Sequence, residues 1–505
     1  MRRQIVAMSA FLAAASLALG ACGLTSNGGG PTTPPTSSPS ANLQGYYNQQ
    51  VQWRSCLNGM QCARVQVPLD YDRPDAARIP LAVARMPLRD QSNKLGSLVL
   101  NPGGPGGSGI QYAQAAQYEL GADVLNRYDI VGFDPRGVGR SRPIECMNDA
   151  QTDKFIATVG PPANAAQTEA LLSASRSVGK TCELNSPALT PNVGTAEAAR
   201  DMDIIRSVLG DAKLNYLGKS YGTFLGLTYA DLFTDRVGRF VLDGVIDPTL
   251  TNDGLAKGQA EGFQLALSRF IANCPKHADC PLPADPKAGL VKINNWLSKL
   301  ATKPIKGQPG RPLTRPMAVN GIVGSLYDQG SGWPALRFGL DAGFKGDGAP
   351  LEEMLDSFVS RGPDGRYLDN SIDALYAVNC LDRPDRADAT RTAELASQWL
   401  KTAPTFGADL AWGNYPCHDW PAPATDGPHE VKASGASPIL LVGTTNDPAT
   451  PYPWAVAVSK QLDSNSLITF DGDGHTAYGR GSACVDDKVD AYLIAGKMPP
   501  GNVTC

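Results

Sequence analysis

A serine between two glycines, in the stretch GKSYG at 218–222, is the feature of this sequence with the clearest chemical potential. The pattern G-x-S-x-G is typical of a sharp strand-to-helix turn that exposes a serine hydroxyl above a sheet. Its glycines are needed because the turn brings the flanking backbone together and leaves no room for Cβ atoms. Residues 214–217 read as a strand and 224–233 as a helix, which is the context that the motif requires. We therefore predict Ser220 as a nucleophile.

A serine hydroxyl needs a base to take its proton, and histidine is the usual one. The sequence holds 4 histidines, and His475 alone follows a predicted core strand, at 466–470. It also comes last in the chain, as the order serine, acid, histidine demands. We predict His475 as the base and interpret His277, His418 and His429 as structural.

The base in turn needs an acid that sets its tautomer and stabilises its charged form. Asp447 stands just past a predicted strand at 438–443, which suits such an acid. Asp471 and Asp473 compete with it, but they are too close in sequence to His475 to face its ring easily. We predict Asp447 as the acid and expect the other two to shape the histidine loop.

Acyl transfer also needs hydrogen-bond donors for the oxyanion that develops on the substrate. The amide of Tyr221, directly after the nucleophile, is one expected donor. The second is expected from the glycine-rich loop 101–109, which follows a predicted strand, with Gly103 or Gly104 donating. A phosphate-binding function for this loop is disfavoured because no GKS or GKT sequence is present and no helix opens on the pattern.

The elements around these residues alternate between strands and helices. An antiparallel hairpin is predicted from 63–67 and 79–85, and a helix is expected to begin with Thr195 as its N-cap and to stop at Gly210. The remaining early strands are predicted at 96–101, 128–133, 214–217 and 237–242. This alternation predicts a mostly parallel sheet covered by helices on both faces.

The pattern changes in the second half of the chain. Between 248 and 436, helical stretches at 256–274, 288–300 and 393–400 alternate with loops rich in glycine and proline. We predict an α/β-hydrolase fold in which a large, mostly helical cap is inserted before the last strands. The first part of the core is assigned to 43–247, the cap to 248–436 and the C-terminal part of the core, with a helix at 485–494, to 437–505.

The N-terminus has the pattern of a secretory signal. Arg2 and Arg3 precede an apolar run at 5–19, and the stretch LGAC at 19–22 resembles a bacterial lipobox. We predict a signal peptide at 1–21, lipid modification of Cys22, and a flexible linker at 22–42, which holds no charged residue. The alternative is a plain secretory signal in which Cys22 is incidental. The lipid would anchor the protein to the outer face of the cell membrane.

The sequence contains 11 cysteines, and setting Cys22 aside leaves an even number, as expected of an oxidised extracytoplasmic protein. A zinc site at His277 is disfavoured because the chain has no CxxC pair, so no metal or other cofactor is expected. The formal net charge of -4, without a basic stripe, gives no case for nucleic acid. By proximity alone we pair Cys56 with Cys62, Cys146 with Cys182, Cys274 with Cys280, Cys380 with Cys417, and Cys484 with Cys505.

Several of these motifs together resemble the family of secreted actinobacterial tripeptidyl aminopeptidases and related proline-iminopeptidase-like serine peptidases. The matching stretches are NPGGPGGSG at 101–109, DPRGVGRS at 134–141, GKSYGT at 218–223, DGVIDP at 243–248, DPATP at 447–451 and DGDGHT at 471–476. The chain from 437 onward resembles the C-terminal domain of tripeptidyl aminopeptidases. The resemblance implies hydrolysis of peptide bonds near a free N-terminus, through an acyl-enzyme.

Such an enzyme needs an acidic group in the cap to hold the substrate ammonium. Asp382 is the candidate, because it follows Cys380, which a disulfide to Cys417 would immobilise; the alternative is a surface carboxylate. Two other functions compete with the peptidase. One is a carboxylesterase or lipase that uses the same triad, and the other is a catalytically silent binding lipoprotein, against which the intact set of catalytic residues argues.

Overall fold

The computed structural model describes residues 41–505. The predicted signal peptide, Cys22 and nearly all of the predicted linker lie outside the described residues. Within 41–505, no helix is both long and apolar enough to cross a lipid bilayer.

The core is a 10-stranded sheet with the order β1-β2-β3-β5-β4-β6-β7-β8-β9-β10. Strands β1, β2, β3 and β5 pair antiparallel, and every pair from β5–β4 to β9–β10 is parallel. The predicted hairpin is confirmed as β2 and β3, with Val65 opposite Leu81. The strands are β1 (Arg54–Ser55), β2 (Gln61–Pro68), β3 (Arg78–Met86), β4 (Gly96–Asn101), β5 (Tyr128–Phe133), β6 (Leu214–Lys219), β7 (Val237–Asp243), β8 (Ile439–Asn446), β9 (Asn465–Asp473) and β10 (Val503–Thr504).

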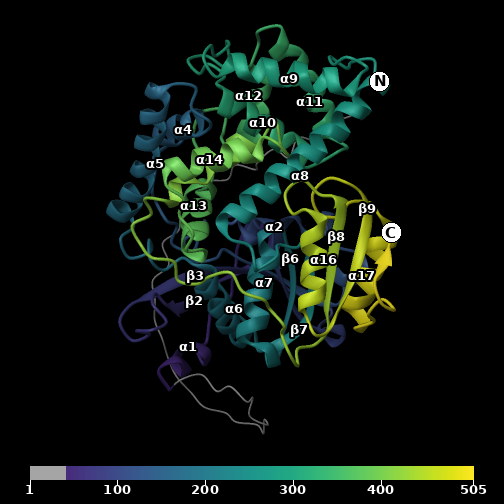
Figure 1. Cartoon of the computed structure of the whole chain (residues 1–505). Coiled ribbons are helices and arrows are strands. Elements are labelled where there is room, and N and C mark those ends of the chain that lie inside the picture. The colour runs from purple at the N-terminus through teal and green to yellow at the C-terminus, as the bar shows by residue number, and fades with distance from the viewer. Residues whose placement is uncertain (1–40) are drawn as a thin grey trace. The chain divides into compact units, whose positions relative to one another are not determined.

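Helices cover both faces of this sheet, as predicted. Every residue of β4 and β5 is buried, which explains why these strands are mostly apolar instead of alternating between apolar and polar residues. Neighbouring residues of β4 point to opposite faces: Leu98 packs in one apolar cluster and Val99 in the other. The first cluster includes α2 (Gly109–Ala115), α3 (Ala122–Leu125) and α17 (Ala483–Ala495). The second includes α6 (Thr195–Leu209), α7 (Tyr221–Leu232) and α16 (Tyr452–Gln461), of which α7 and α16 lie over β6 to β8 in Figure 1.

The start of α6 differs from the prediction. Gly194 is its N-cap, and Thr195 is the first helical residue. The Thr195 hydroxyl is not used for capping because it is hydrogen-bonded to Asp382 and to Tyr221. The predicted stop is confirmed, since Gly210 ends the helix with a left-handed backbone (φ 81°) that glycine adopts without strain.

A run of helices separates β7 from β8, and no strand of the sheet falls within 244–438. Figure 1 shows α9 to α12 gathered together above the sheet, with α8 running from them toward it. Two helices that precede β6, α4 (Asp149–Thr158) and α5 (Ala165–Asn185), also contact this region, through α10 and η7. The helices of the region are α8 (Asn252–Asn273), α9 (Pro286–Leu300), α10 (Arg315–Leu326), α11 (Gly332–Phe344), α12 (Ala349–Phe358), α13 (Ser371–Asp382), α14 (Ala389–Trp399), α15 (Gly407–Gly413) and the 3-10 turn η7 (Tyr415–Cys417).

All five predicted disulfide bonds are present, so the pairing by sequence proximity is confirmed. The bonds join Cys56 to Cys62, Cys146 to Cys182, Cys274 to Cys280, Cys380 to Cys417, and Cys484 to Cys505.

The five bonds fall into three groups by what they connect. The bond from Cys56 to Cys62 and the bond from Cys274 to Cys280 each close a short local loop, whereas the bond to Cys505 fastens the C-terminus to the start of α17.

The other two bonds cross-link helices. The bond between Cys380 and Cys417 connects α13 to η7, and both cysteines are buried. The bond between Cys146 and Cys182 joins the start of the α4 region to the end of α5. These two cross-links therefore hold helices that surround the site described next.

Candidate active site

Ser220 stands at the turn between β6 and α7 with a backbone conformation that non-glycine residues rarely adopt (φ 56°, ψ −125°). Such a conformation costs about 1–3 kcal/mol and persists where the surroundings impose it. Here the Ser220 amide donates to the Asp243 carbonyl (2.9 Å). A Cβ on Gly218 would lie 2.4 Å from the Gly222 oxygen, so the first glycine of the motif is sterically required. The fold thus forces the serine side chain out of the elbow.

Asp447 directly follows β8 and is hydrogen-bonded to His475, which follows β9. Its two carboxylate oxygens lie 2.9 and 3.0 Å from His475 Nδ1. Asp447 is almost fully buried and also accepts backbone N–H bonds from Ala449, Thr450 and Thr476. These bonds hold the carboxylate in one orientation, and the structure brings together the acid and the base predicted from the sequence.

The His475 ring also lies beside the serine elbow. Gly244 follows Asp243, whose carbonyl accepts the Ser220 amide. A Cβ on Gly244 would be 3.3 Å from His475 Cε1. The elbow, the acid and the histidine thus lie at the same edge of the sheet, where β6, β7, β8 and β9 end. This carboxyl edge is where open parallel sheets place their sites.

Tyr327 is a residue of this site that sequence reasoning missed. Its carbonyl accepts the His475 amide (2.9 Å), and its ring packs edge-on against the imidazole with centroids 5.1 Å apart. Tyr327 follows α10, more than a hundred residues before the histidine, and no local motif marks it. The packing places part of the helical insertion directly against the base.

The two aspartates predicted to shape the histidine loop have partners outside the triad. Asp471 accepts from the Thr445 hydroxyl (3.0 Å), and Asp473 pairs with Arg269. Neither is hydrogen-bonded to the imidazole.

The glycine-rich loop after β4 touches the nucleophile, and its two candidate donors differ. A Cβ on Gly103 would lie 2.9 Å from Ser220 Cβ and 3.0 Å from the Tyr221 nitrogen. The Gly103 amide donates to the Asn101 side chain (2.9 Å). Gly104 is an exposed residue, and its amide has no hydrogen-bond partner in the part of the chain that the structure describes. Of the two, Gly104 therefore has the N–H that is available to a substrate oxygen.

A cavity of about 260 Å³ lies between α4 and the helices of the insertion. Its lining is largely apolar and includes Phe155, Ile156, Val319, Val323, Phe358 and Leu375. Amide side chains such as Asn252, Gln259 and Asn379 are interspersed among them. This composition suits a small organic group with apolar side chains and a polar backbone.

Residues from three of the helices around this cavity lie against three loops of the site. On α8, Gln259 donates to the Ala449 carbonyl (3.1 Å), two residues after Asp447. Helix α10 leads to Tyr327, which packs on His475 and on Phe358. At the start of α13, the Ser371 carbonyl would be 2.8 Å from a Cβ on Gly106, in the glycine-rich loop. The walls of the cavity therefore contact the loops that carry the acid, the base and the candidate oxyanion donor, although none of these groups lines the cavity itself.

Asp382, the predicted amine-binding residue, is buried at the end of α13. Its two carboxylate oxygens accept from the Thr195 amide and hydroxyl (2.7 Å each), and that hydroxyl is 2.6 Å from the Tyr221 hydroxyl. Burial raises the pKa of Asp382 to about 6, although Arg383 and the Thr195 hydrogen bonds oppose the rise. Asp382 thus approaches the residue after the nucleophile, but it does not line the cavity.

Glu197, on the first turn of α6, is a second carboxylate beside Asp382. A Cβ on Gly194 would be 2.7 Å from Glu197 Oε2 and 3.7 Å from Asp382 Oδ1. Glu197 Oε2 is buried and lacks a hydrogen-bond partner among residues 41–505. The sequence gives no motif that would single out this residue.

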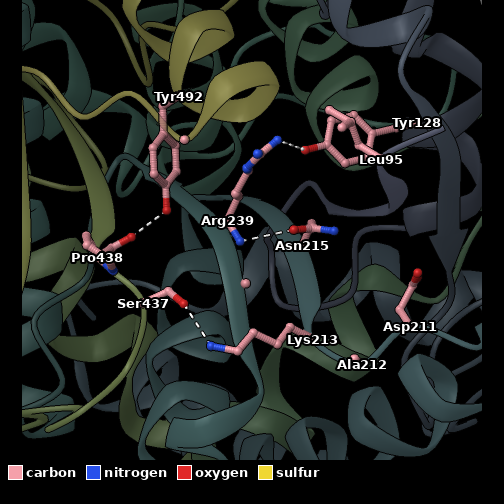
Figure 2. A pocket seen from close by; sticks show the side chains of 12 residues that line it. Leu95, Tyr128, Asp211, Ala212, Lys213, Asn215, Arg239, Ser437, Pro438 and Tyr492 are labelled. Carbon is pink, nitrogen blue, oxygen red and sulfur yellow. Dashed lines mark hydrogen bonds between the residues drawn. The ribbon is translucent and has the colours of Figure 1, made fainter. Parts of the chain in front are cut away.

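A larger cavity, of about 470 Å³, lies at the opposite edge of the sheet, where β6 and β7 begin (Figure 2). Its polar groups are bonded to one another: Lys213 to Ser437, the Arg239 amide to Asn215, and Tyr492 to the Pro438 carbonyl. The Arg239 guanidinium donates to the Tyr128 hydroxyl. This cavity lies where the strands begin, whereas Ser220, Asp447 and His475 follow the ends of β6, β8 and β9.

The fold and the site together define the chain as an α/β-hydrolase with a serine-type active centre. Comparison with known proteins agrees, because a model of the family described as TAP-like protein matches residues 403–505.

Three relatives extend the similarity to nearly the whole chain. Serine protease Hip1 of Mycobacterium tuberculosis is 37% identical over 90% of this chain and 91% of its own length. Carboxylesterase B of the same species is 36% identical over 90% of both chains. Tripeptidyl aminopeptidase of Streptomyces lividans is 30% identical over 90% of this chain and 86% of its own. The chain belongs to this family of serine hydrolases.

Proposed function

We propose that the protein is a serine exopeptidase that cleaves peptides near a free N-terminus through an acyl-enzyme. The observation that carries the proposal is that a strained Ser220, the Asp447–His475 pair and the glycine-rich loop lie at one edge of the sheet, on loops that also contact the walls of a largely apolar cavity. Ser220 Oγ bonds to the scissile carbonyl carbon, and its proton passes to His475 Nε2. His475 then gives that proton to the leaving amine as the peptide bond breaks.

Water completes the cycle. It loses a proton to His475 and attacks the ester carbonyl, and Ser220 recovers its proton as the N-terminal fragment leaves as a carboxylic acid. In both steps the negative charge on the carbonyl oxygen would be held by the Gly104 and Tyr221 amides. The Tyr221 amide opens α7 and has no acceptor within the helix. Asp447 holds His475 Nδ1 and stabilises the imidazolium.

The cap cavity would hold the N-terminal side of the substrate, and Asp382 with Glu197 would favour its ammonium group. Glu197 Oε1 pairs with Arg200 (3.2 Å), whereas Oε2 lies on the side of Asp382, so an ammonium beside Oε2 would be attracted by both carboxylates. The unpaired Glu197 Oε2 supports this assignment. Two relatives named as a protease and as a tripeptidyl aminopeptidase support a peptide substrate.

Acetylation of the peptide amine is expected to lower kcat/KM by about 10- to 100-fold, the worth of a charge-assisted hydrogen bond. Asp382→Asn should raise KM for unblocked peptides by about 10-fold and leave acetylated peptides nearly unaffected. The measurement is a kinetic comparison of matched free and acetylated peptide anilides, with the half-exposed Asp426→Asn as the control variant. Equal rates on free and acetylated peptides would remove the exopeptidase proposal. If Asp382→Asn lowered the activity on free and acetylated peptides equally, Asp382 would have only a structural role, in holding Thr195.

A carboxylesterase is the second candidate, because a 36% identical relative carries that name and the acyl-enzyme chemistry is shared. The same assays separate the two functions. An esterase should prefer short acyl esters that contain no amine, and its rate on peptide substrates should not depend on acetylation.

We also propose that the protein is a lipoprotein on the outer face of the cell membrane. The lipobox-like stretch ending at Cys22 and the five disulfide bonds support an extracytoplasmic, anchored protein. Cys22→Ala is expected to move the protein from the membrane fraction to the soluble fraction, as measured by fractionation and immunoblot, whereas Ser26→Ala should not. Persistence of the Cys22→Ala variant in washed membranes would contradict the lipid anchor.

A further inference from the structure

A buried ion cluster lies directly behind the triad, and the reaction described above does not use it. Lys219 and Asp243 are 7% and 0% exposed, although isolated charges are almost never buried this deeply. Lys219 Nζ donates to Glu119 Oε2 (2.7 Å) and to the Tyr478 carbonyl (2.9 Å). The Asp243 carboxylate accepts the amides of Ala477 (3.0 Å) and Tyr478 (2.9 Å).

These bonds join the nucleophile elbow to the histidine loop. Lys219 immediately precedes Ser220, and the backbone carbonyl of Asp243 accepts the Ser220 amide. Ala477 and Tyr478 come two and three residues after His475. Through these contacts, one lysine and one carboxylate fix the backbone on both sides of the serine–histidine pair.

We propose that Lys219 and Asp243 are positioning residues, which hold the His475 loop against the elbow and balance each other's charge beside the base. The proposal rests on the proposed role of Ser220 and His475. Burying a charge in a protein is tolerable when an opposite charge and hydrogen bonds accompany it. Removing the charge of Lys219 or of Asp243 therefore leaves the opposite charge of the other less balanced, in a region with little solvent.

Other charged groups around His475 belong to separate pairs. Asp447 binds Nδ1, and Arg480 donates to the His475 carbonyl (2.9 Å) while it pairs with Asp328. The cap contributes the uncharged Tyr327 ring and carbonyl. On the side of the cluster away from His475, Lys219 is paired with Glu119. The Tyr112 ring is also close to Lys219, with its centre 5.7 Å from Nζ.

The two residues should affect the base in opposite directions. Asp243→Asn removes a negative charge, so protonation of the imidazole becomes less favourable and the acid limb of the kcat/KM–pH profile should move down by roughly 0.5–1 pH unit. Lys219→Met removes a positive charge and should move the same limb up by a similar amount. Lys219→Arg keeps the charge and should restore the wild-type limb.

The experiment is the pH profile of kcat/KM for these variants on a short acyl ester, together with thermal unfolding of each variant. An ester is used because its hydrolysis depends on Ser220 and His475 but not on a free amine. Opposite shifts support the proposal. A fall in kcat or in Tm without a shift, or shifts in the same direction, would show a purely structural role and overturn it.

Glu119→Gln keeps the test decisive if Lys219→Met does not fold. The Glu119 side chain is 34% exposed and lies behind Lys219, so Glu119→Gln should shift the limb in the direction of Asp243→Asn but by less. No shift in either carboxylate variant would also overturn the proposal. If ester hydrolysis is the same in wild type and Ser220→Ala, the proposed function fails instead, which keeps the two failures distinguishable.

Discussion

Ser220→Ala is expected to lower kcat by about 10⁶-fold, because the oxygen that forms the acyl-enzyme is removed. Binding and the oxyanion donors stay in place, so KM should change little. The elbow backbone at φ 56° is as strained for alanine as for serine, and the free energy of unfolding should stay within about 0.5 kcal/mol of the wild type. The variant should fold and bind but not turn over.

Two assays check this result. Steady-state rates on peptide anilides should fall to background, and labelling by a fluorophosphonate should disappear. Ser298→Ala, on the exposed face of α9, is the matched control and should keep both activities. Labelling that survives in Ser220→Ala would place the nucleophile elsewhere.

Asp447→Asn is expected to lower kcat by about 10⁴-fold, the usual cost of leaving the histidine in the wrong tautomer. The Asp447 oxygens accept from His475 and from three backbone amides, and the NH₂ group of asparagine cannot accept any of these bonds. In one orientation the asparagine oxygen would face the backbone amides and its NH₂ group would face His475 Nδ1. In the other the oxygen would face Nδ1, and the NH₂ group would face the buried N–H donors of the backbone. Both arrangements disrupt the pair.

The measurement is kcat on the same anilide, with folding checked by circular dichroism. Asp471→Asn is the control, since Asp471 is an exposed aspartate at the same edge of the sheet whose carboxylate accepts from the Thr445 hydroxyl, and it should lose less than about 10-fold. Comparable losses in the two variants would contradict the assignment of Asp447 as the acid.

Much of the core could be predicted because its signals are local. Strands β4 and β5 are mostly apolar and have the predicted bounds, and the elbow needs glycines where two backbones meet. Asp447 and His475 could be paired from chain order and strand-end position alone. The five disulfides follow sequence proximity because each joins residues at most 37 positions apart.

The remaining features depend on contacts between distant segments. Tyr327 reaches His475 from the end of a cap helix, and Glu197 meets Asp382 although the two are 185 positions apart in the sequence. The prediction of Thr195 as an N-cap was wrong because its hydroxyl is engaged by Asp382 from the cap. The choice between Gly103 and Gly104 depends on which amide Asn101 binds, which only the folded loop decides.

The most direct test of the central claim uses a tripeptide phosphonate, a probe that traps the serine as a stable covalent adduct. It is made with a free amine and, separately, with an acetylated one. After reaction with the wild-type protein, the labelled peptide is located by mass spectrometry and the rate of labelling is compared between the two probes. We predict a single adduct on Ser220 that forms at least about 10-fold faster with the free amine. An adduct on another residue, or equal rates for the two probes, would contradict a serine exopeptidase centred on Ser220.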